Sequence, residues 1–160
     1  MIPVISIVGR HDSGKTTLLV SLLGVLQARG LKIAVIKHSH HVLTFGDDTD
    51  TDLLFGAGAQ AVYTVSPDVT LRYRRQAEQP PDSYLEELKD SGVDIIITEG
   101  YKHERFFKIE VLRRDIATES MGLPGTIAHV SDFLMESPRP VFDFTATEAL
   151  CDHILKHVLP

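Results

Sequence analysis

The chain has 160 residues, which fits one domain over residues 1–160 with a sizeable hydrophobic core. Its formal net charge of −6 argues against a broad nucleic-acid-binding surface. The single cysteine, Cys151, allows no internal disulfide and fits a reducing compartment. No apolar run approaches the ~20 residues of a membrane span, and no basic segment precedes the first apolar run as in a signal peptide. We therefore expect a cytoplasmic protein that binds neither nucleic acid nor membrane.

The first part of the chain alternates between strand-like and helix-like patterns. The predicted elements are a strand over 3–8, a helix over 15–29, a strand over 32–37 and a short helix over 53–57. The continuous β-favouring character of 32–37 is typical of a buried parallel strand. Asp50 or Thr51 is the expected cap of the short helix, which Gly58 ends.

Two strands, over 61–65 and 69–73, flank the turn residues Ser66-Pro67-Asp68 and predict a β-hairpin. The remaining predicted elements are a helix from Pro80-Pro81-Asp82-Ser83 through Leu88, strands over 93–98, 108–112, 126–130 and 140–144, and a final helix from Thr145 or Thr147 to about Val158. This alternation predicts an α/β fold, with a mostly parallel sheet flanked by helices and the hairpin as an insertion. Such sheets bind ligands at the carboxyl ends of their strands.

A phosphate-binding motif follows the first predicted strand. Residues 9–16 read Gly9-Arg10-His11-Asp12-Ser13-Gly14-Lys15-Thr16, which is G-x-x-x-x-G-K-[ST], and Thr17 comes next. The strand before it and the helix after it are the context in which this pattern forms a P-loop; the alternative is a glycine-rich turn that only caps a helix. Glycines let the backbone approach an anion, and the loop amides and helix N-terminus surround it. We expect Lys15 to reach the β- and γ-phosphates and Thr16 to ligate Mg²⁺.

Acidic residues are candidate partners for that magnesium ion. Glu99 follows the most apolar predicted strand, where P-loop proteins place an acid that holds Mg²⁺ through water or orients an attacking water. Gly100 beside it offers a backbone N–H to the γ-phosphate. The stretch before the short helix holds four aspartates: Asp47, Asp48, Asp50 and Asp52. Their spacing alone does not select one of them.

Three of the eight histidines, His38, His40 and His41, cluster after the second predicted strand. Zinc needs three or four converging ligands, whereas an extended segment points His38 and His40 to one side and His41 to the other. No cysteine pair supports a zinc site. We therefore interpret these side chains as contacts to phosphate or to a bound anionic partner.

Four segments, taken in order, resemble the MobB family of molybdopterin-guanine dinucleotide biosynthesis adaptor proteins. They are the loop 9–17, Ile36-Lys37-His38 with His40-His41, Asp50-Thr51 with Ala57-Gly58-Ala59, and Ile97-Thr98-Glu99-Gly100-Tyr101-Lys102. The resemblance covers about residues 3–132. It implies a GTP-binding, usually homodimeric P-loop protein that assists the attachment of GMP to molybdopterin, together with the nucleotidyltransferase of that pathway. It also implies Asp50 as the aspartate near Mg²⁺.

The chain departs from many GTPases because it contains no N-K-x-D sequence, which reads guanine in those proteins. Ser131-Asp132 follows a predicted strand at about the right place. Asp132 is therefore our candidate acceptor for the guanine N1–H and N2–H₂ groups, with an ordinary strand-end acid as the alternative. The last 28 residues carry little family signal.

The leading hypothesis is an accessory GTPase with slow turnover. Lys15, the loop amides and Mg²⁺ would neutralise the phosphates, and Glu99 or Asp50 would position water. No catalytic arginine is evident, so Arg10, a second subunit or a partner would have to supply one.

Two other hypotheses stay open from the sequence. One is an ATP-dependent small-molecule kinase whose lid carries three arginines: Arg72, Arg74 and Arg75. The other is a non-catalytic adaptor that binds a nucleotide or cofactor and delivers it to an enzyme. Lys37, Lys102 and the histidines nearby would then accept an anionic pterin phosphate, or would instead close over GTP.

Overall fold

The computed structural model describes residues 2–39, 43, 46 and 48–159. The chain divides into two compact units. The first unit is Met1–His38 with Pro81–Pro160, and the second is Ser39–Pro80. The single nucleotide-binding domain expected over 1–160 stays a prediction.

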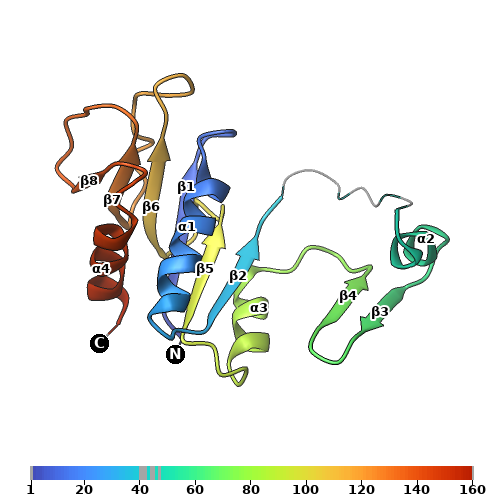
Figure 1. The fold of residues 1–160 in the computed structure, drawn as a ribbon. Coiled ribbons are helices and arrows are strands. Elements are labelled where there is room, and N and C mark those ends of the chain that lie inside the picture. Colours follow the sequence, from blue (N-terminus) through green and yellow to red (C-terminus); the bar gives the residue numbers. More distant parts are fainter. Residues whose placement is uncertain (1, 40–42, 44–45, 47, 160) are drawn as a thin grey trace. The chain divides into compact units, whose positions relative to one another are not determined.

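A six-stranded sheet forms the centre of the first unit (Figure 1). Its strands are β1 (Val4–Gly9), β2 (Ile33–Lys37), β5 (Ile95–Glu99), β6 (Phe107–Leu112), β7 (Thr126–Ser131) and β8 (Val141–Phe142). They lie in the order β2-β5-β1-β6-β7-β8, and every neighbouring pair is parallel. The mostly parallel sheet predicted from the sequence is thus confirmed. Parallel pairing brings the carboxyl ends of β1, β2 and β5 to one edge, and these ends carry Gly9, Lys37 and Glu99.

The strand predicted over 140–144 is shorter than expected, because Asp143 ends it. The Asp143 Oδ1 atom accepts hydrogen bonds from the backbone N–H groups of Thr145 (2.7 Å) and Ala146 (3.1 Å). These bonds turn the chain into α4 (Thr147–Val158), which begins at one of the two predicted starts and has Ala146 as its N-cap. The Thr145 hydroxyl also donates to Asp143 Oδ1. This bond, followed by the two backbone bonds, holds the pKa of Asp143 below its usual value.

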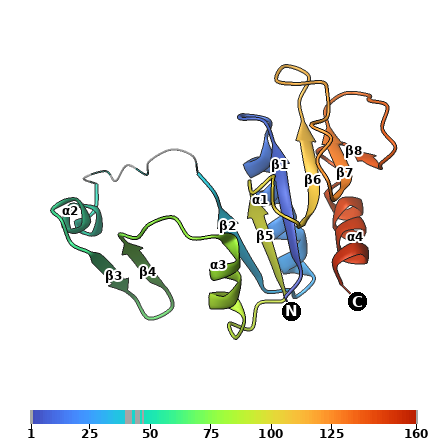
Figure 2. The same cartoon turned by 180° about the vertical axis from the view of Figure 1, so that it is seen from behind.

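Helices cover both faces of the sheet. Helix α1 (Lys15–Ala28) packs against α4 on one face, and α3 (Pro81–Leu88) lies on the other (Figures 1 and 2). The α1–α4 layer buries the apolar sheet positions, including Ile7, Ile97 and Ile109. Within the described ranges, no helix is long and apolar enough to cross a membrane.

Cys151 lies in the core on α4, where it is fully buried. Burial raises the pKa of its thiol to about 11, so the reactive thiolate is scarce at neutral pH. The only cysteine therefore serves packing rather than chemistry.

The opposite face of the sheet buries polar groups. Successive strand side chains alternate between faces, so Ser6 lies opposite the core face that receives Ile5 and Ile7. The Ser6 hydroxyl hydrogen-bonds that of Thr98 at 2.6 Å. Lys108, only 1% exposed, donates from Nζ to the carbonyl oxygens of Glu104, Phe106 and Pro124 at 2.6–2.9 Å. Burial lowers the Lys108 pKa, opposed by the charge of Glu104.

The second unit contains α2 (Asp50–Gly56) and an antiparallel hairpin, β3 (Ala61–Val65) with β4 (Thr70–Arg74). The hairpin confirms the predicted insertion. The cap of α2 is Thr49, whose hydroxyl accepts from the backbone N–H of Asp52 at 3.2 Å. The expectation of Asp50 or Thr51 as the cap is wrong, because the helix begins at Asp50, three residues before the predicted start at Leu53.

Candidate phosphate-binding site

The loop after β1 has the tight backbone that its glycines predicted. Gly14 and Asp12 both adopt left-handed conformations, with φ of 92° and 58°. Gly9 makes the closest approach: a Cβ there would lie 2.6 Å from the Val111 carbonyl oxygen and 2.6 Å from the Ser13 hydroxyl. Because the chain turns this tightly, α1 begins directly at Lys15 and its N-terminus faces the loop.

Replacing Gly9 with alanine is expected to lower the free energy of unfolding by about 2 kcal/mol or more, because the added methyl group collides with a backbone oxygen. Gly24→Ala is the matched control. Nothing lies within 4 Å of the Cβ position at Gly24, in the middle of α1, so this change should stabilise by about 0.5–1 kcal/mol. Denaturant unfolding of both variants tests the comparison, and equal effects would contradict the observed loop.

Lys15 lies folded onto the loop, with Nζ donating to the Arg10 carbonyl oxygen at 2.6 Å. Burial lowers the pKa of Lys15, and the repulsion of Lys37 adds to this. The carboxylates of Glu99 and Asp12 oppose the shift. A bound anion would stabilise the partly desolvated Lys15 ammonium and would also accept hydrogen bonds from the loop amides.

Glu99 joins the loop to the neighbouring strands. It is 7% exposed, and its two carboxylate oxygens both accept from the Thr16 hydroxyl at 3.0 Å. The Lys37 ammonium lies 3.3 Å from Glu99 Oε1. The structure thus brings Thr16 and Glu99, predicted from separate motifs, into direct contact.

The donor atoms at this point suit magnesium. A hydroxyl and a carboxylate are hard oxygen ligands, and Mg²⁺ bound with phosphates takes only one or two protein oxygens. Over the residues that the structure describes, no group of three His, Cys, Asp or Glu side chains is placed to hold a metal. The interpretation against zinc stays a prediction, because His40 and His41 lie outside the described residues.

Other predicted site residues occupy distinct places. Gly100 follows Glu99 with φ of 100°, and a Cβ there would lie 3.3 Å from the Cβ of His38. His38 stacks on Tyr101 with ring centroids 4.8 Å apart. Asp50 belongs to the second unit, at the start of α2, and Asp47 lies outside the described residues. The roles of Asp50 and Gly100 at the phosphates stay predictions.

Asp132 is exposed just after β7, and its Oδ1 accepts from the backbone N–H of Arg114 at 2.9 Å. The carboxylate therefore ties the end of β7 to the loop that follows β6. Its second oxygen makes no hydrogen bond to the described residues, so the predicted role as a guanine acceptor stays open.

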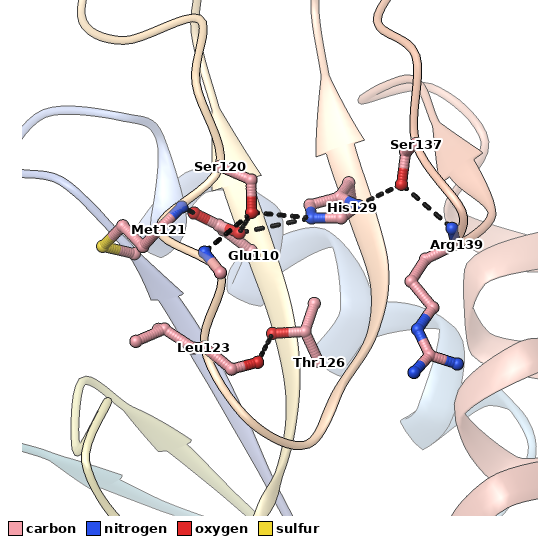
Figure 3. A network of polar contacts seen from close by, with 9 residues as sticks. Glu110, Ser120, Met121, Leu123, Thr126, His129, Ser137 and Arg139 are labelled. Atoms are coloured by element: carbon pink, nitrogen blue, oxygen red, sulfur yellow. Dashed lines mark hydrogen bonds and ion pairs between the residues drawn. The ribbon is translucent and has the colours of Figure 1, made fainter.

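A buried network between β6 and β7 was not foreseen from the sequence (Figure 3). Glu110 and His129 are paired across the strands, 1% and 4% exposed, with Oε2 and Nε2 3.2 Å apart. Glu110 also accepts from the Ser120 hydroxyl at 2.6 Å and the Met121 N–H at 2.7 Å. The Ser137 hydroxyl lies 3.0 Å from His129 Nδ1. The sequence signal that could have revealed this network is the presence of a glutamate and a histidine inside two predicted strands.

A six-stranded parallel sheet with a glycine-rich phosphate loop after its central strand defines a P-loop NTPase-like fold. The family model for molybdopterin guanine dinucleotide synthesis protein B, MobB, matches residues 4–132. The chain belongs to the MobB family, as its sequence motifs predicted.

Relatives match over nearly the whole chain. The molybdopterin-guanine dinucleotide biosynthesis adapter protein of Escherichia coli is 32% identical, covering 98% of this chain and 93% of that protein. The adapter protein of Haemophilus influenzae is 28% identical, over 96% and 88%. The crystal structure of Bacillus subtilis MobB superposes with a TM-score of 0.76 at 22% identity, covering 98% of each chain, which supports the fold.

Proposed function

We propose that the chain is a GTP-binding accessory protein, with slow GTPase activity, that assists the attachment of GMP to molybdopterin. The contact between Thr16 and Glu99 beside Lys15 carries the nucleotide part of this proposal. Membership in the MobB family and the adapter names of its relatives support the pathway and the accessory role.

The residues divide the work by their chemistry. Lys15 would leave the Arg10 carbonyl oxygen and bind the β- and γ-phosphates as a point charge. Thr16 would ligate Mg²⁺, with Glu99 behind it and Asp50 as a further candidate, and the ion would supply charge neutralisation at the phosphates. Lys37 would keep the Glu99 carboxylate oriented. Asp132 is the candidate reader of guanine.

The proposed partners are the nucleotidyltransferase of the pathway, the anionic pterin molybdopterin and a second copy of this chain in a cytoplasmic homodimer. The second unit exposes several large apolar side chains, namely Leu53, Leu54, Tyr63, Val65, Val69 and Leu71. A two-stranded hairpin with so much exposed apolar surface is typical of an element that packs against a partner. This surface supports an interaction through the second unit.

One of the three arginines proposed as the lid of a kinase, Arg75, is engaged within the second unit. Arg75 donates to the carbonyl oxygens of Phe55 (2.5 Å) and Ala59 (3.2 Å), and its guanidinium lies 4.3 Å from the centre of the Phe55 ring. The Arg75 side chain therefore stabilises the second unit, which argues against a role in binding a phosphate.

Calorimetric titration with GTP and with ATP, each with Mg²⁺, tests the proposed function. We expect GTP to bind at least about tenfold more tightly, with slow phosphate release from the bound nucleotide. A preference for ATP would overturn the guanine assignment and bring the kinase forward. GTP binding without phosphate release would leave a non-catalytic adaptor.

A further inference from the structure

We propose that Arg113 supplies a second fixed positive charge to the phosphate-binding loop and so strengthens nucleotide binding without touching the nucleotide. This inference rests on the proposed function, because it assigns a role in GTP binding to a residue outside the loop motif. Arg113 follows β6 directly, and β6 pairs with β1, whose end begins the loop.

The guanidinium of Arg113 lies against the backbone of the loop. A Cβ placed on Gly14 would be 3.1 Å from Arg113 Nε and 3.2 Å from Nη2. Gly14 is the left-handed residue immediately before Lys15. A Cβ at this position would push the guanidinium away by a few tenths of an ångström, so Gly14 favours this contact as well as the turn.

One further contact holds the guanidinium, and two hydrogen bonds order the backbone that carries it. The ring of Phe144 lies under it, with the Cζ atom 4.7 Å from the ring centroid, which is the geometry of a cation–π contact. The Arg113 carbonyl oxygen accepts from the backbone N–H groups of Ile116 (2.9 Å) and Ala117 (2.8 Å), which closes the following loop on itself. That loop is also anchored where Ser120 and Met121 bind Glu110 (Figure 3).

The charge of Arg113 has no acidic partner within salt-bridge distance among the described residues. Its Nε atom is buried without a hydrogen-bond acceptor in that same part of the chain. The neighbouring Ser13 hydroxyl, in the loop itself and 1% exposed, is likewise buried with no partner among the described residues. Both side chains line one small cavity together with Arg10 and two carboxylates, Glu110 and Glu119.

A guanidinium stays protonated in proteins, so Arg113 brings positive charge to a partly desolvated site whether or not a ligand is present. Neither carboxylate of the cavity lies within salt-bridge distance of Arg113, and Glu110 is already bonded to Ser120, Met121 and His129. Here its field reaches the loop, where the phosphates of a nucleotide would supply the opposite charge.

Three variants test the proposal by calorimetry with GTP and Mg²⁺. Arg113→Gln keeps a planar polar side chain but removes the charge, and we expect about tenfold weaker binding. Arg113→Lys keeps the charge and should bind within about threefold of the unchanged chain. The control is Arg114→Gln, because Arg114 is exposed and stacks on Phe133 at 5.4 Å; it should bind as the unchanged chain does.

The salt dependence of binding separates charge from packing. Loss of one positive charge should make the affinity of Arg113→Gln less sensitive to ionic strength, whereas a purely structural defect would leave that sensitivity unchanged. Unaltered affinity of Arg113→Gln, or equal weakening by Gln and Lys with unchanged salt dependence, would overturn the proposal. If the unchanged chain binds neither GTP nor ATP, the proposed function itself fails, and this inference falls with it.

Discussion

Lys15→Ala is expected to weaken the binding of GTP with Mg²⁺ by about 100-fold or more. A lysine that bonds two phosphate groups makes charge-assisted hydrogen bonds worth about 1.5–3 kcal/mol each, and each 1.4 kcal/mol is tenfold in affinity. The Lys15 ammonium lies over the loop, bonded only to the Arg10 carbonyl oxygen among the described residues, so the folded chain should lose little stability without it.

Isothermal titration of Lys15→Ala against the unchanged chain measures this effect. Lys156→Ala is the control because it also removes one lysine charge, but in the last turn of α4 and outside the phosphate-binding loop. The control should bind GTP normally. If Lys15→Ala binds GTP within about threefold of the unchanged chain, the loop does not bind the nucleotide phosphates.

Glu110→Ala is expected to lower the free energy of unfolding by about 3 kcal/mol or more, the largest effect on stability that we foresee. Removing one member of a buried charged pair costs about 3–5 kcal/mol, because the partner groups remain buried without it. Here the change would deprive the Ser120 hydroxyl, the Met121 N–H and His129 of their shared acceptor. The loop between β6 and β7, which Glu110 holds through Ser120 and Met121, would lose its anchor.

Denaturant unfolding gives the measurement, and Glu86→Ala is the control. Glu86 is exposed, and among the residues that the structure describes it forms an ion pair only with Lys89, three residues away, so its removal should cost less than about 0.5 kcal/mol. A loss below about 1 kcal/mol for Glu110→Ala would mean that the network contributes little to stability.

The same variant should change the pH dependence of stability. Burial alone raises the pKa of Glu110, but the hydrogen bonds from His129, Ser120 and the Met121 N–H outweigh it, and the net pKa lies below its usual value. A carboxylate with a depressed folded-state pKa adds stability above its unfolded pKa of about 4.3 and loses it as the pH falls through the folded value. The stability difference between the two chains should therefore shrink below about pH 4.

Most of the fold follows from local patterns in the sequence. Strand-like runs predicted β1, β2, β5, β6 and β7 to within two residues at each end, because apolar side chains occupy the core face of these strands. The boundary residues were less predictable. Asp143 and Thr49 end or start their elements through side-chain hydrogen bonds, which the apolar period does not register.

The sequence by itself determined the glycine-rich loop, since the motif and the strand and helix that flank it lie in one continuous stretch of chain. It also determined the family, because several motifs occur in one order. Only the tertiary structure decided which distant residues meet: Glu99 with Thr16, Glu110 with His129, and Arg113 with Gly14. These pairs depend on strand order and register, which arise from the packing of the whole sheet and leave no local pattern to read.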